Sequence, residues 1–143
     1  MNQSRYANIV RIGAVYDIVA TLPFAVPLLS AWAFQLFAGL DAWLGLGTSF
    51  SVLDPTSMFF INLGALAYVI WGVARLREPS VANGRLDALL RLLVVGLQMV
   101  ALSQGATPIL WGLAVVLSVF AVLQLRRPNH AVSAGPEKRA LGY

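Results

Sequence analysis

Residues 57–74 read SMFFINLGALAYVIWGVA, a run that contains no charged side chain. A helix needs about 20 mainly apolar residues to cross roughly 30 Å of membrane hydrocarbon, so this stretch predicts a transmembrane helix with little tilt. Three other stretches qualify in the same way. The predicted spans run over about 9–37, 57–74, 86–103 and 108–125.

The overall composition also indicates a membrane protein. Of the 143 residues, 59% are hydrophobic and 11% are charged, whereas a soluble domain carries about 25% charged residues. The chain therefore has too few polar side chains to cover a water-facing surface. We predict an all-α membrane protein, a four-transmembrane-helix bundle that residues 1–128 form as a single domain. The polar residues 129–143 are predicted to be a disordered cytoplasmic tail.

The positive charges are distributed on one side of the predicted spans. All ten lie before or at the start of the first span, around the connection between the second and third, or after the fourth: Arg5, Arg11, Arg75, Arg77, Arg85, Arg91, Arg126, Arg127, Lys138 and Arg139. The other two connections contain none. Because cationic flanks stay in the cytoplasm, this asymmetry predicts that both termini are cytoplasmic. The membrane-flanking cations also account for the net charge of +4, so we predict no nucleic acid as a partner.

The first span contains two prolines and leads into an unusual connection. Pro23 and Pro27 interrupt the helical hydrogen-bond ladder and are expected to kink this span in its outer half. Residues 37–50 are apolar but short and rich in glycine. The sequence leaves open whether residues 38–55 form an interfacial helix on the outer membrane surface or a plain loop.

Asp17 is the most informative residue, because an ionisable group inside a span is by default a functional hypothesis, at a cost of about 2.5–3.5 kcal/mol at the helix centre. Asp17 is expected in the inner third of the span rather than at its middle, which lowers this cost and favours a structural ion pair. It lies some 9 Å deeper than Arg11 along the helix, at about 1.5 Å per residue. Its expected partner is Arg91 in the third span, at similar depth. The alternative to a functional role is an ion pair that locks two helices. Asp87, Arg91 and Gln98 share one side of the third helix, which suits a vestibule or interhelical hydrogen bonding equally.

Three further residues complete the candidate intramembrane polar site. Asn62 and Gln98 lie deep in the second and third spans and must find hydrogen-bond partners there. Tyr16 adjoins Asp17. Hydrogen bonding between helices is the plainer interpretation of Asn62 and Gln98.

Small residues mark the helix faces that we expect to pack. Such residues let two helices approach closely in a membrane. Ala65 and Gly72 lie on the Asn62 side of the second span, and a second stripe on the fourth span consists of Ala114, Ser118 and Ala121.

Several chemistries are excluded by what the sequence lacks. It has no cysteine, which removes disulfides, thiol catalysis and cysteine metal sites. The only histidine, His130, lies beyond the last span, so intramembrane histidine ligation of haem or another metal is impossible. No HExxH, phosphate-loop or GxSxG motif is present. We therefore predict no catalytic residue, no metal site and no cofactor.

Parts of the sequence resemble a group of small, uncharacterised bacterial four-helix inner-membrane proteins. The resemblance is carried by RIGAVYD at residues 11–17, LPFA at 22–25 and DPTSMFFIN at 54–62, the last continuing through Trp71 to Arg75. It covers most of residues 10–125. The resemblance implies the architecture and a bacterial inner (plasma) membrane, and it transfers no activity.

Three functional hypotheses follow. The first is a non-enzymatic accessory or assembly protein, or one that interacts with lipid; its partners would be the bilayer and a second copy or another membrane protein. The second is a small proton-coupled transporter or permeation subunit in which Asp17 titrates. The third is an intramembrane lipid-modifying enzyme with Asp17 as its acid or base. The second and third require Asp17 to be reachable, whereas the first is compatible with a sealed ion pair.

Overall fold

The computed structural model describes residues 2–126, and the predicted tail, residues 129–143, lies outside them. The described residues form five helices: α1 (Gln3–Ala25), α2 (Pro27–Trp43), α3 (Pro55–Arg77), α4 (Val81–Ser103) and α5 (Ile109–Leu125). Three of them, α1, α3 and α4, are long and apolar enough to cross a membrane, and α5 is a shorter apolar helix. The described residues therefore form an all-helical bundle with helices of the membrane-spanning type.

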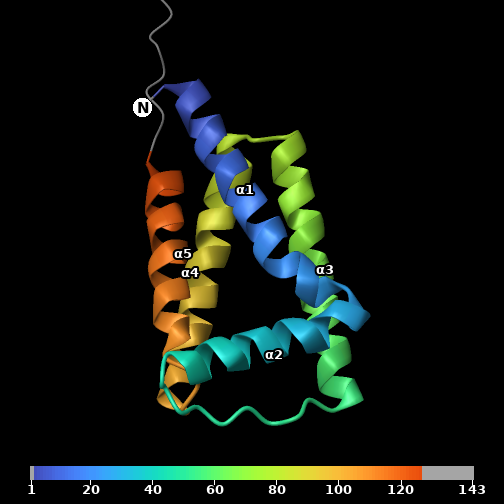
Figure 1. Cartoon of the computed structure of the whole chain (residues 1–143). Coiled ribbons are helices and arrows are strands. Elements are labelled where there is room, and N and C mark those ends of the chain that lie inside the picture. Colours follow the sequence, from blue (N-terminus) through green and yellow to red (C-terminus); the bar gives the residue numbers. More distant parts are fainter. Residues whose placement is uncertain (1, 127–143) are drawn as a thin grey trace, which may run out of the picture.

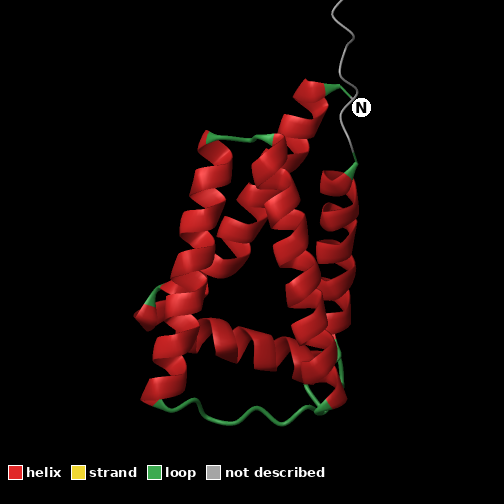
Figure 2. Cartoon of the chain, turned by 180° about the vertical axis from the view of Figure 1, so that it is seen from behind, coloured by secondary structure: helices red, strands yellow, loops and turns green. Residues whose placement is uncertain are grey.

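The helices pack mainly in two pairs, α1 with α3 and α4 with α5 (Figure 1). In this view α1 crosses the bundle obliquely. The turn between α3 and α4 lies at the same end as the N terminus, and we call this the α3–α4 end. At the opposite end, α2 lies across the bundle above the loop that leads to α3, as the view from behind also shows (Figure 2). We call this the α2 end.

The prediction of one kinked span over residues 9–37 was wrong, because two separate helices occupy this segment. α1 ends at Ala25, Val26 has an extended conformation with φ −105° and ψ 115°, and Pro27 begins α2. Pro27 has no N–H to continue the ladder of α1, and its fixed φ suits the first position of a new helix. Pro23 lies inside α1, which continues past it.

The connection over residues 38–55, left open by the sequence, is divided between a helix and a loop. Residues 38–43 complete α2, and residues 44–54 form the loop. Gly45 and Gly47 have φ values of 67° and 69°, a left-handed conformation that glycine adopts without strain. The loop ends at Asp54, the N-cap of α3.

The connection between α3 and α4 is shorter than the predicted spans 57–74 and 86–103 imply. α3 continues to Arg77, and α4 begins at Val81, where Ser80 accepts a hydrogen bond from the Asn83 amide at 3.1 Å. The extension of α3 places Arg75 inside a helix, although the sequence suggested a cation that flanks the membrane.

The buried and exposed side chains are distributed in the opposite way to those of a soluble protein. Large apolar side chains are exposed on all five helices, such as Ile12, Leu28, Phe60, Leu97 and Val115. The interior instead contains mainly small residues and polar or charged groups, with Tyr6, Val10 and Leu117 as its larger apolar or aromatic members. A helical bundle with an apolar outer surface and satisfied backbone polar groups is what a bilayer requires.

Gly72 allows α1 to pack against α3. A methyl group at residue 72 would lie 2.6 Å from Cγ1 of Ile18, whereas one at Gly64 on the same helix meets no atom within 4 Å. We expect Gly72→Ala to lower the free energy of unfolding by about 1–3 kcal/mol through overpacking. Unfolding by SDS in mixed micelles measures this. Gly64→Ala is the matched control, with the same gain in helix propensity of about 1 kcal/mol; equal stability of the two variants would contradict the packing described.

Candidate functional site

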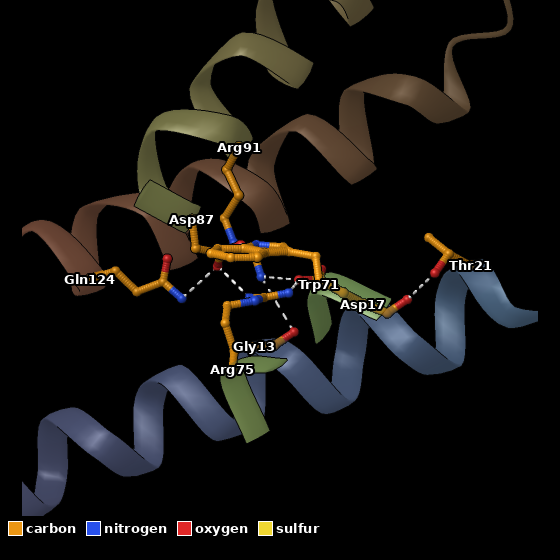
Figure 3. A network of polar contacts seen from close by, with 8 residues as sticks. All are labelled: Gly13, Asp17, Thr21, Trp71, Arg75, Asp87, Arg91 and Gln124. Carbon is orange, nitrogen blue, oxygen red and sulfur yellow. Dashed lines mark hydrogen bonds and ion pairs between the residues drawn. The ribbon is translucent and has the colours of Figure 1, made fainter. Parts of the chain in front are cut away.

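Four charged side chains from three helices meet inside the bundle (Figure 3). Asp17 comes from α1, Arg75 from α3, and Asp87 and Arg91 from α4; their side chains are 2% exposed for Asp17 and 0% for the other three. Gln124 of α5 joins them. We call these five residues the ionic cluster.

Asp17 is held by both arginines of the ionic cluster. Its Oδ2 atom accepts hydrogen bonds from Nη2 of Arg75 at 2.6 Å and from Nη2 of Arg91 at 2.5 Å. The same Arg91 nitrogen also donates to the carbonyl oxygen of Gly13 at 3.3 Å. The predicted pair between Asp17 and Arg91 is therefore confirmed, and Arg75 is a second partner that the sequence analysis did not identify.

Asp87 is the second acceptor and binds a larger set of donors. Its Oδ2 atom accepts from Nε of Arg91 at 2.9 Å and from Nε2 of Gln124 at 2.8 Å, and lies 2.5 Å from Nη1 of Arg75. Its Oδ1 atom accepts from the indole N–H of Trp71 at 3.1 Å. Asp87 therefore links α3, α4 and α5, and does more than form the local pair with Arg91 on one helix.

The cluster contains two positive and two negative groups and is neutral as a whole. Removing a charge from water costs several kcal/mol, and only close pairing with further hydrogen bonds offsets that cost. The two guanidinium groups gain additional contacts, since Arg91 lies over the Phe120 ring at 4.9 Å and Arg75 over the Trp71 ring at 5.6 Å. With Asp17 on α1 and Gln124 on α5, one neutral cluster joins α1, α3, α4 and α5.

The other predicted site residues lie outside the ionic cluster or at its border. Tyr16 is half-buried and stacks on Phe120, with ring centroids 5.7 Å apart, on the ring that also faces Arg91. Gln98 is half-buried, and its buried Oε1 has no hydrogen-bond partner among the described residues. The structure thus brings together only Asp17 and Arg91 of the five predicted residues.

Asn62 forms its hydrogen bond away from the ionic cluster, near the break between α1 and α2. Its Nδ2 donates to the carbonyl oxygen of Phe24 at 2.7 Å. Phe24 lies in the last turn of α1, where carbonyl groups lose their helical partners because the chain turns away at Val26. The prediction that Asn62 binds another helix is confirmed, and its partner is a backbone group that the break leaves free.

Arg75 and Gln124 were missed, although the small-residue stripes pointed to both. The stripe of Ala65 and Gly72 on α3 reaches Arg75 three residues further on. The stripe that ends at Ala121 on α5 reaches Gln124 in the same way. Both residues lie near helix ends, where a polar side chain is expected to extend to the lipid headgroups. For this reason the sequence analysis did not place them in the interior.

Comparisons with known proteins place the chain in no family. No protein-family model matches it, and no curated protein or solved structure matches it either. The fold and the ionic cluster therefore define the class of the protein: a helical bundle of the membrane type, built around a buried and neutral set of ion pairs.

The ionic cluster predicts a clear pattern in a double-mutant cycle. Asp17→Asn leaves surplus positive charge buried, and Arg75→Gln leaves surplus negative charge, so each should lower the free energy of unfolding by about 3–5 kcal/mol. The double variant restores neutrality, because Asp87 and Arg91 remain paired. Its loss should be smaller than the sum of the single losses by about 0.5–3 kcal/mol, measured by unfolding in SDS-containing micelles.

The control for this cycle is Asp54→Asn, an exposed N-cap on α3 that has no contact with the ionic cluster. Asparagine caps helices about as well as aspartate, so this variant should stay within about 0.5 kcal/mol of the wild type. Strict additivity of Asp17→Asn and Arg75→Gln would contradict a shared, charge-balanced cluster.

Proposed function

We propose that the protein is a non-enzymatic integral membrane protein that crosses a bacterial inner membrane four times, with both termini in the cytoplasm. Its role is that of an accessory or assembly partner, or of a protein that interacts with lipid. The four crossings would be α1, α3, α4 and α5. The length and apolar composition of α1, α3 and α4, and the apolar character of the shorter α5, support this placement.

The cations support the proposed orientation, with one change from the sequence argument. Arg75 and Arg91 are buried in the ionic cluster and no longer count as membrane-flanking charges. The remaining described cations are all exposed: Arg5, Arg11, Arg77, Arg85 and Arg126. They lie on α1, around the turn between α3 and α4, or at the end of α5, and the loop 44–54 and the α4–α5 turn contain none. This asymmetry favours a cytoplasmic α3–α4 end.

One observation carries the proposal of a structural role: both carboxylates of the ionic cluster are buried and paired with the two arginines. Asp17 is 2% exposed and its Oδ2 atom accepts hydrogen bonds from two arginines. Asp87 is 0% exposed, accepts three hydrogen bonds and forms an ion pair with Nη1 of Arg75. A transported proton or a lipid substrate would need one of these carboxylates to be reachable. Their burial therefore favours the accessory role over a transporter or a lipid-modifying enzyme.

The proposed orientation is testable with single cysteines, because the chain has none of its own. Ser103→Cys lies at the α2 end, and Glu78→Cys lies at the α3–α4 end; both positions are exposed. In intact cells, a membrane-impermeant maleimide should label Ser103→Cys and should label Glu78→Cys only after permeabilisation. The reverse pattern would overturn the orientation, and labelling of both in intact cells would overturn the proposed number of crossings.

The accessory role also predicts the behaviour of the purified protein in proteoliposomes. We expect no pH-dependent flux of protons or cations above that of empty vesicles, because Asp17 is sealed by Arg75 and Arg91. Asp17→Asn should reduce the yield of folded protein and leave this background unchanged. A flux that appears in the wild type and disappears in Asp17→Asn would contradict the accessory role and establish the transporter.

A further inference from the structure

A cavity of about 770 Å³ lies at the α2 end, between α2, the loop 44–54 and the turn from α4 to α5. This volume lies within the range of about 300–1,000 Å³ that is typical of ligand sites. None of the ionic cluster residues lines it. The cavity is therefore a second feature of the bundle, separate from the buried ion pairs.

The lining of this cavity is apolar with neutral polar groups, and it contains no charged side chain. Phe34 of α2 and Phe50 and Leu53 of the loop supply apolar surface, and Gln35 and Ser49 supply an amide and a hydroxyl group. Such a lining suits a ligand with a long apolar part and an uncharged, hydrogen-bonding end. A phosphate group would lose its hydration here without gaining a cation as partner, which is unfavourable.

Asp41 holds the three walls of the cavity together. Its side chain is 1% exposed, and it accepts hydrogen bonds from the Thr107 hydroxyl and from the Thr48 amide, the latter at 3.0 Å. Thr48 and Thr107 both line the cavity. One carboxylate at the end of α2 thus fastens the loop and the α4–α5 turn.

Asp41 lies outside the proposed spans, and its charge bears on the choice of ligand. Burial acts to raise the pKa of Asp41, but the hydrogen bonds from Thr107 and Thr48 outweigh it and lower the pKa below its ordinary value. Asp41 is therefore ionised at neutral pH. A negative charge directly behind the cavity wall disfavours an anionic ligand further.

We propose that this cavity binds a neutral lipid of the diacylglycerol class, with an acyl chain against the apolar walls and the hydroxyl end near Gln35 and Ser49. The outer face of α2 carries large exposed apolar side chains such as Trp32, Leu36 and Trp43, which suit contact with membrane lipid. The membrane beside α2 would then supply the lipid to the cavity. The proposal names the ligand for a lipid-interacting protein, and it rests on the proposed placement of the α2 end at a membrane surface.

The test uses two neighbouring single-cysteine variants in phosphatidylcholine nanodiscs. Gln104 lines the cavity, and Ser103 beside it is exposed but does not line it. Dioleoylglycerol, added at about ten times its Kd, should slow maleimide labelling of Gln104→Cys about ten-fold by occupying the site, and should leave Ser103→Cys within about two-fold. Phosphatidate with the same acyl chains should protect Gln104→Cys far less.

Each contrary result has a definite meaning. Equal protection by phosphatidate would overturn the assignment of an uncharged ligand. Equal protection of both cysteines, or protection of neither, would overturn the site itself. Because Ser103→Cys also reports the orientation in cells, a failure of the membrane placement is distinguished from a failure of the lipid site.

A cavity-filling variant provides an independent check. Ala38→Trp places a large ring in the cavity from α2 and should abolish the protection of Gln104→Cys by dioleoylglycerol. Thermal unfolding of this variant shows whether the bundle remains intact. If Ala38→Trp does not fold, the labelling of Gln104→Cys without this substitution still decides the proposal. If Ala38→Trp folds and dioleoylglycerol protects Gln104→Cys as before, the proposal is overturned.

Discussion

The interior of this bundle is organised by the need to neutralise buried charge. Two guanidinium groups and two carboxylates lie where α1, α3 and α4 meet, and each carboxylate binds both arginines. This pairing requires a close approach of the helices, which small residues permit. A methyl group at Gly13 would lie 3.1 Å from Nη2 of Arg91, and one at Gly72 would collide with Ile18. The ion pairs of the cluster therefore depend on the small residues that let the helices approach closely.

The two ends of the bundle solve different problems. Toward the α3–α4 end, strong charge-assisted hydrogen bonds fix the helices relative to one another. At the α2 end the helix breaks at Val26, and single hydrogen bonds take the place of the ion-pair network: Asn62 binds the freed carbonyl of Phe24 at the end of α1, and Asp41 of α2 binds Thr107. The crosswise helix α2 separates the loop from the core. The cavity lies between α2, the loop and the α4–α5 turn. A fixed interior and an open end in one small bundle suit the proposed role of an accessory protein that interacts with lipid.

The helical architecture and one ion pair could be predicted from the sequence, because long apolar runs and an isolated intramembrane aspartate are strong signals. The break at Val26 was missed because a proline such as Pro27 kinks a helix or begins a new one, and only tertiary contacts decide between the two. Arg75 was missed because a cation near a helix end ordinarily flanks the membrane. Asp87 was recognised only as part of a polar side of the third helix, since its contacts with α3 and α5 depend on helix packing that periodicity does not reveal.

The central claim is that one neutral cluster ties α1, α3, α4 and α5 together. Hydrogen–deuterium exchange of the backbone amides in Asp17→Asn, compared with the wild type in the same nanodiscs, tests it most directly. The account predicts faster exchange in all four helices around the cluster. The loss of the Asp17 charge leaves surplus positive charge buried in the cluster, which weakens the contacts of every helix that it joins. Faster exchange that is confined to α1 would contradict the account and reduce Asp17 to a local contact.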